Sequence, residues 1–181
     1  MNGSLQLISA ETPGVELHAI GPGDLESLRL WKNAHRRSFF FQGLLTPEDQ
    51  ERWFDGYRDR PDDYMFILSV RGEPIGCIGL RLLDGSLGVY NVILGVAAMG
   101  GQGWMRQALR LLGTFALARY AGIPIGLKVL RTNPAVAWYQ RNGFVETEAL
   151  EEYLELRLDL RAFPPCAGLQ ASDGPHRPTG G

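Results

Sequence analysis

The sequence contains few of the residues that mark metal sites and disulfide-stabilised folds. Its 181 residues include two cysteines, Cys77 and Cys166, which are too few for a cysteine-rich zinc site, and the three histidines lack metal-ligand spacing. The sequence is compatible with a disulfide, but two free thiols in a reducing compartment are the simpler interpretation. We therefore expect a cytoplasmic protein without a metal.

Strong net charge and long hydrophobic runs are also missing. The net charge is −2, so the chain has no overall attraction for nucleic acid or an anionic membrane. No apolar run approaches the roughly 20 residues of a membrane span. Residues 1–11 lack the basic start and apolar stretch of a secretion signal. We expect neither nucleic acid nor a membrane as a partner.

The first part of the chain predicts one strand and two helices. Residues 15–20 alternate between apolar and polar side chains, which favours a strand. Asp24 is a suitable N-cap for a helix whose apolar residues recur at helical spacing. Thr46 and Pro47 fit the cap and the first position of a second helix, which ends near residues 60–61.

An antiparallel meander is predicted next. Residues 64–71, 75–83 and 87–94 are rich in apolar side chains, and Asp84-Gly85 is a strong hairpin turn between the last two runs. These runs are continuously apolar instead of alternating. Both faces of the sheet should therefore be covered.

A parallel crossover should follow the meander. Small residues at 95–103 join its last strand to an amphipathic helix at 104–120, and a strand at 125–130 comes after the helix. A short helix and two further strands complete the prediction, at residues 134–142, 144–147 and 153–160.

The composition also suggests where the folded unit begins and ends. We expect one domain at residues 13–162, preceded by an N-terminal arm at 1–12. Residues 163–181 are rich in proline and glycine with few large apolar side chains, so they should form a disordered tail.

The segment Gly100-Gly101-Gln102-Gly103 lies where a strand turns into a helix. Glycines allow a close backbone approach to an anion, and the first free amides of the helix would point at it. The segment is either a pyrophosphate cradle or a plain flexible connection. It lacks the Gly-Lys-Ser/Thr ending of a nucleotide triphosphatase loop, and a dinucleotide fingerprint would need glycine at Arg106.

A second motif places Tyr139 on a short helix between Asn133 and Gly143-Phe144. An unperturbed phenol has a pKa of about 10 and stays protonated at neutral pH. It is therefore suited to donate a proton to a departing thiolate. The alternative is an aromatic side chain that packs a helix end.

Together the two motifs resemble the GCN5-related N-acetyltransferase (GNAT) superfamily. Residues 100–105 match a loop of pattern Arg/Gln-x-x-Gly-x-Gly/Ala, and residues 139–144 match a Tyr-x-x-x-Gly-Phe segment. The resemblance covers residues 15–160. It implies an α/β fold with a central mixed sheet flanked by helices, in the order β-α-α-β-β-β-α-β-α-β-β.

The resemblance also implies an activity and a donor site. The expected reaction is direct transfer of an acyl group from acetyl-CoA, or another acyl-CoA, to the amine of a small molecule, with Tyr139 as the acid for the leaving sulfur. Residues on the third meander strand, in the glycine loop and after the next strand would bind the donor, namely Ile93, Leu94, Gly95, Val96, Gly100, Gly101, Gln102, Gly103, Trp104, Met105 and Asn133. Relatives of this kind often form homodimers.

The first half of the chain narrows the resemblance to one branch of the superfamily. The segment 28–33, with Trp31, resembles the Leu-x-x-Trp-Arg-Asn start of a branch with amino-sugar-nucleotide and ribosomal-protein acetyltransferases. By that resemblance the acceptor side includes two arginines, which would hold a phosphate or carboxylate, and three aromatics, namely Arg36, Arg37, Phe39, Phe40 and Phe41. The alternative is a core aromatic run beside a solvated arginine pair.

Three departures from the family pattern leave alternatives open. Gly100 replaces the usual Arg or Gln, Met105 replaces a small residue, and the stretch between Asn133 and Tyr139 is one residue short. An acyl carrier protein thioester is therefore an alternative donor, and a non-catalytic ligand-binding protein is an alternative function.

The general base is not evident from the sequence. Residues 88–94 contain no carboxylate of the kind that assists in many relatives. We expect a water-relayed base that touches Tyr90 or Asn91, or an acceptor amine with an intrinsically low pKa. Glu146 and Glu148 are more distant choices.

Overall fold

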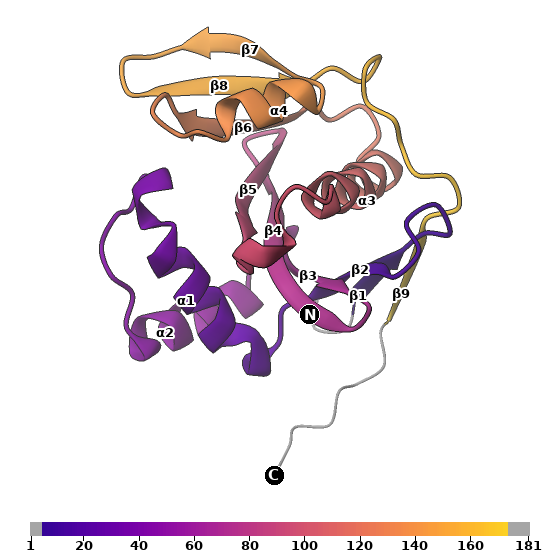
Figure 1. The fold of residues 1–181 in the computed structure, drawn as a ribbon. Coiled ribbons are helices and arrows are strands. Elements are labelled where there is room, and N and C mark those ends of the chain that lie inside the picture. The colour runs from indigo at the N-terminus through magenta and orange to yellow at the C-terminus, as the bar shows by residue number, and fades with distance from the viewer. Residues whose placement is uncertain (1–4, 174–181) are drawn as a thin grey trace.

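The computed structural model describes residues 5–173, which form one mixed sheet flanked by helices (Figure 1). The nine strands have the spatial order β7-β8-β6-β5-β4-β3-β2-β1-β9. Their bounds are β1 (Leu5–Ile8), β2 (Val15–Ala19), β3 (Asp63–Val70), β4 (Glu73–Leu83), β5 (Ser86–Leu94), β6 (Ile125–Leu130), β7 (Phe144–Ala149), β8 (Tyr153–Leu158) and β9 (Gln170–Asp173). The helices are α1 (Leu25–Ala34), α2 (Pro47–Arg58), α3 (Trp104–Arg119) and α4 (Val136–Arg141), with short 3-10 turns η1 (Pro22–Asp24), η2 (Arg36–Ser38) and η3 (Ala97–Met99).

The predicted fold class and element order are confirmed from β2 to β8. Thr46 caps α2 as expected, because its hydroxyl accepts a hydrogen bond from the amide of Asp49 at 3.2 Å. Asp24 is the N-cap residue of α1, but its carboxylate accepts a bond from the amide of Gly21 and not from a helix amide.

The structure extends the folded unit beyond both expected limits. Part of the expected N-terminal arm is strand β1, and the expected disordered tail is corrected for residues 163–173, because β9 pairs antiparallel with β1. Phe163 is 5% exposed and lies against Gly113 of α3, where a Cβ would come within 2.5 Å of its ring. Phe163 and the buried Cys166 hold this segment on α3 despite its proline-rich composition. Residues 174–181, part of that expected tail, lie outside the described residues.

Both faces of the sheet are covered, as the continuously apolar strands predicted. Alternate side chains point to two separate clusters: Phe66 and Ile78 pack under α3, whereas Ile67 and Cys77 pack under α1 and α2. Both cysteines are free and buried. Burial raises the pKa of the Cys77 thiol to about 12, so this thiol is not a nucleophile at neutral pH.

Strands β5 and β6 separate soon after they meet. They pair in parallel at Leu87–Ile125 and Gly88–Gly126, and β6 then turns away to pair with β8. Strand β5 stays on β4 but carries a bulge between Tyr90 and Ile93. The bulge includes Asn91, whose φ of +47° is unusual for a residue with a side chain. The sheet is therefore split at this point.

Within residues 5–173 there is no helix with the length and apolar character needed to cross a membrane.

The packing of Phe163 gives the first prediction. Phe163→Ala removes a buried ring and should lower the free energy of unfolding in a urea titration by about 3–5 kcal/mol. Leu160→Ala is the matched control, because Leu160 is 55% exposed and its loss should change stability by about 0.5 kcal/mol. Equal stability of the two variants would show that the segment after residue 162 does not pack on the domain.

Candidate active site

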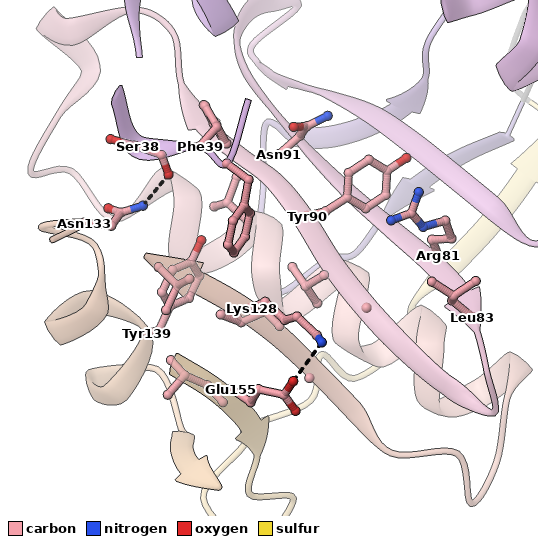
Figure 2. A pocket seen from close by; sticks show the side chains of 18 of the residues that line it. Ser38, Phe39, Arg81, Leu83, Tyr90, Asn91, Lys128, Asn133, Tyr139 and Glu155 are labelled. Carbon is pink, nitrogen blue, oxygen red and sulfur yellow. Dashed lines mark hydrogen bonds and ion pairs between the residues drawn. The ribbon is translucent and has the colours of Figure 1, made fainter. Parts of the chain in front are cut away.

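A cavity of about 710 Å³ opens at the split between β5 and β6 (Figure 2). Its walls come from α1 and the loop that follows it, from β5 and β6, and from α4 and β8. Eight of the predicted site residues line it, namely Arg36, Phe39, Phe40, Phe41, Tyr90, Asn91, Asn133 and Tyr139. Arg37 is not among the lining residues and is exposed.

Tyr139 projects from α4 into this cavity (Figure 2). Its ring packs edge-on against Trp138 and Phe144, with centroid distances of 5.2 and 5.8 Å. The side chain is 7% exposed, and its hydroxyl makes no hydrogen bond within residues 5–173. Burial raises the pKa of this phenol above its usual value of 10. The packing fixes the ring and leaves a protonated hydroxyl facing the cavity.

The loop between α1 and α2 forms the outer wall and is held at two points. Asn33 binds the backbone of Leu45 through both ends of its amide, at 2.8 and 2.9 Å. At the other point, Asn133 donates to the carbonyl of Ser38 at 3.1 Å and accepts from the amide of Ala135 at 2.8 Å. The side chain of Asn133 thus ties the loop to the start of α4, and its predicted contact with a donor stays a prediction.

The three consecutive phenylalanines do not share one role. Phe39 is partly buried against the cluster under α1 and α2. Phe40 packs edge-on against Tyr153 at 5.5 Å, although it is 56% exposed, and Phe41 is 65% exposed. The alternative of a wholly buried aromatic run is wrong, because two of the rings form an open apolar wall.

A carboxylate that the sequence analysis missed lies beside Tyr90. The Tyr90 ring crosses over Gly79, where a Cβ would come within 2.5 Å of it, and its hydroxyl donates a hydrogen bond to Asp63 at the start of β3. Asp63 is 1% exposed and pairs with Arg60 at 3.6 Å. Burial, followed by the charge of Asp63, raises the pKa of Tyr90 well above 10. No local motif signals this contact, because it joins residues 27 positions apart.

The glycine loop lies beside the split, on the face covered by α3 (Figure 1). Gly101 and Gly103 have φ values of +74° and +81°, which glycine adopts at low cost. Within the described chain, the amides of residues 101–103 make no backbone hydrogen bond outside the helix, and the first helical amides of α3 lack intrahelical partners. The loop therefore presents a row of free N–H donors, which is the requirement for binding a diphosphate.

Two residues at the helix start pack inward. Trp104 and Met105 are partly buried against the cluster under α3. The side chain of Met105 thus packs in part against the core under α3.

Part of the predicted donor contact on β5 is corrected. The amides of Gly95 and Val96 both bind the carbonyl of Ile75, at 2.8 and 3.0 Å, so they are not free. Successive amides of a strand point to opposite sides, so the amide of Leu94 faces the side that β6 has left. Gly95 has another role, because the indole of Trp31 occupies the place that a Cβ would take there.

Five cationic side chains line the cavity, Arg36 among them as predicted, and three of the five come from separate elements. Lys32 comes from α1, Arg36 from η2 and Arg81 from β4. Glu155 of β8 also lines it and pairs with Lys128 at 2.7 Å (Figure 2). Within residues 5–173, no three His, Cys, Asp or Glu side chains gather as metal ligands.

A single mixed sheet flanked by helices is also the fold of solved acetyltransferase structures, and the sequence comparison agrees. The chain belongs to the acetyltransferase (GNAT) domain family, whose sequence model matches residues 15–145. A search among curated proteins finds no match.

Several solved structures are similar in fold. An acetyltransferase from Thermus thermophilus is 21% identical, with a TM-score of 0.65 and coverage of 89% of this chain and 99% of its own. The spermidine N-acetyltransferase from Vibrio cholerae, in complex with CoA and spermine, is 21% identical, with a TM-score of 0.64 and coverage of 80% and 92%. The ribosomal L7/L12 alpha-N-protein acetyltransferase RimL, in complex with coenzyme A, is 20% identical, with a TM-score of 0.62 and coverage of 90% and 95%.

The free amides of the loop give the second prediction. Gly103→Glu places a carboxylate beside them, and repulsion should weaken coenzyme A binding by about 100-fold in a calorimetric titration. Gly103→Ala is the matched control, because it has the same backbone strain without the charge, and nothing lies within 4 Å of the new Cβ. It should bind coenzyme A within about fivefold of wild type. Unchanged affinity of the Gly103→Glu variant for coenzyme A would show that the diphosphate does not bind at this loop.

Proposed function

We propose that this protein is an N-acetyltransferase that transfers the acetyl group of acetyl-CoA to an amine of a small molecule, by direct attack in a ternary complex. The observation that carries the proposal is the free hydroxyl of Tyr139, which lies in the wall of a cavity at a split between parallel strands. A donor held at the glycine loop and an acceptor in the cavity approach this hydroxyl from opposite faces of the sheet.

The proposed donor site consists of backbone groups. The amides at residues 101–105 would hold the diphosphate, with the weak preference of a helix N-terminus for negative charge adding to their hydrogen bonds. The amide of Leu94 lies where an extended amide-bearing arm can add to β5, as a further strand would. The inward packing of Met105 favours coenzyme A over a carrier-protein thioester, because the loop stays open to a diphosphate.

The proposed chemistry uses few groups of the chain. The thioester supplies an activated acyl group when bound. The cavity holds the amine beside the acyl carbon, a carbon–nitrogen bond forms as the carbon–sulfur bond breaks, and Tyr139 donates its proton to the sulfur. Its raised pKa keeps this donor protonated at all physiological pH values.

The proton that the amine loses needs an acceptor, and Tyr90 offers a route. Its hydroxyl already donates to Asp63, so it can take a proton from an amine or from an intervening water as its own proton moves to the carboxylate. This proposal refines the expectation of a water-relayed base at Tyr90 or Asn91. The more distant choices, Glu146 and Glu148, are exposed on β7 and do not line the cavity.

The third prediction tests Tyr139 as the acid. Tyr139→Phe keeps the ring packing but removes the donor, so kcat in a thiol-release assay should fall by about 10²–10⁴-fold. The loss should be constant between pH 7 and 10, because a phenol with a raised pKa is protonated throughout this range. Tyr153→Phe, outside the cavity lining, is the matched control and should keep full activity. Binding of coenzyme A without turnover on any amine would instead favour a ligand-binding protein.

The fourth prediction tests Tyr90 as the proton route. Tyr90→Phe keeps the ring but breaks the link to Asp63, so kcat/KM at pH 7 should fall by about 10- to 100-fold. The loss should shrink as the pH rises toward the amine's pKa of about 10, because the free amine then needs no base. A loss that is equal at every pH would contradict the proton route and indicate a structural role.

A further inference from the structure

The residues that line the cavity have a net positive charge, whereas the whole chain is slightly negative. Five cationic and two anionic side chains line it, whereas the whole chain has a net charge of −2. One of the two carboxylates, Glu155, is already neutralised by Lys128. The cavity therefore has a local positive charge that the composition of the chain does not suggest.

Of the five cations, only Lys128 forms an ion pair among the described residues. Within residues 5–173, no carboxylate lies within ion-pairing distance of Lys32, Arg36 or Arg81. Outside the cavity lining, six cations of the described chain pair with a carboxylate, namely Arg29, Arg52, Arg58, Arg60, Arg110 and Arg161. Lys32 would gain most from a bound anion. Burial lowers the pKa of its ammonium group, and an anion beside it would raise that pKa again.

All three cations are held in place by other contacts. The ammonium of Lys32 lies 5.7 Å from the centre of the Trp53 ring, and the guanidinium of Arg81 lies 5.1 Å from that of Tyr90. Arg36 donates to the carbonyl of Asn33 at 3.3 Å. None of these contacts neutralises the charge, so the cavity offers positioned cations to a ligand.

These cations are not placed to bind the phosphates of the donor. The glycine loop belongs to the face covered by α3, whereas Lys32 and Arg36 come from α1 and η2 on the opposite face (Figure 1). No residue of the loop lines the cavity. The charge is therefore on the acceptor side of the split.

We propose that the acceptor is a primary amine that also carries a phosphate or carboxylate group, which Lys32, Arg36 and Arg81 bind. This inference rests on the proposed function. It also excludes a polycationic acceptor: this cavity would repel a second ammonium group. Phosphate and carboxylate share the chemistry that a guanidinium recognises, so the choice between them is left to the experiment.

The test uses amines that differ at one end only. The series is 5-aminopentyl phosphate, 5-aminopentanoate, pentylamine and 1,5-diaminopentane, each measured with acetyl-CoA in the thiol-release assay. We expect kcat/KM to be about 10- to 100-fold higher for an anionic acceptor than for pentylamine, and lowest for the diamine. The better of the two anionic compounds identifies the group. A preference for pentylamine or the diamine would overturn the proposal.

Paired variants then locate the anion. Arg36→Gln should raise KM for the anionic amines by about 10-fold or more and leave pentylamine and coenzyme A unaffected. Arg37→Gln, one residue away but outside the cavity lining, should have no effect. Equal effects of the two variants would overturn the assignment to Arg36.

Calorimetric binding of 5-aminopentyl phosphate and 5-aminopentanoate separates this inference from the proposed function. Binding of either compound that Arg36→Gln abolishes, without turnover of any amine, would keep the anion site and reject the acetyltransferase. Turnover of amines without preference for an anionic group would keep the acetyltransferase and reject the anion site.

Discussion

The structure depends on the separation of β5 and β6 after two paired residues. Parallel strands normally continue as a ladder, and every backbone group on the open edge then has a partner. Here β6 leaves to pair with β8 while β5 stays on β4 through a bulge at Asn91. The separation of the two strands opens a gap in the sheet, and the amide of Leu94 faces this gap. Both the cavity and the approach to the donor loop follow from this separation.

The two faces of the split sheet have different chemistry. On the side of α3, the glycine loop offers neutral backbone amides that would bind the diphosphate of the proposed donor. On the side of α1, charged side chains from three separate elements would bind the proposed acceptor. Tyr139 lies in the cavity wall between them, where the proposed reaction needs its hydroxyl. A change of acceptor therefore needs new side chains on one face, with no change in the backbone that holds the donor.

The sequence predicts contacts between nearby residues better than contacts between distant ones. Tyr139 could be predicted because its helix, its spacing to Gly143-Phe144 and its chemistry are all local. Asp63 could not, because its bond to Tyr90 depends on strand register and on Gly79 leaving space for the ring. The use of the Gly95 and Val96 amides by Ile75 likewise follows from pairing across β4 and β5. Composition gave the wrong prediction after residue 162, where the buried side chains of Phe163 and Cys166 pack the segment onto the domain.

The acceptor wall and the acid differ in how firmly the fold holds them. Tyr139 is buried in the main core and packed by two aromatic rings, so its position is set by the same contacts that stabilise the domain. The loop between α1 and α2 is held mainly by the side-chain amides of Asn33 and Asn133. A few hydrogen bonds open at much lower cost than a core. Movement of the loop therefore costs less free energy than displacement of Tyr139.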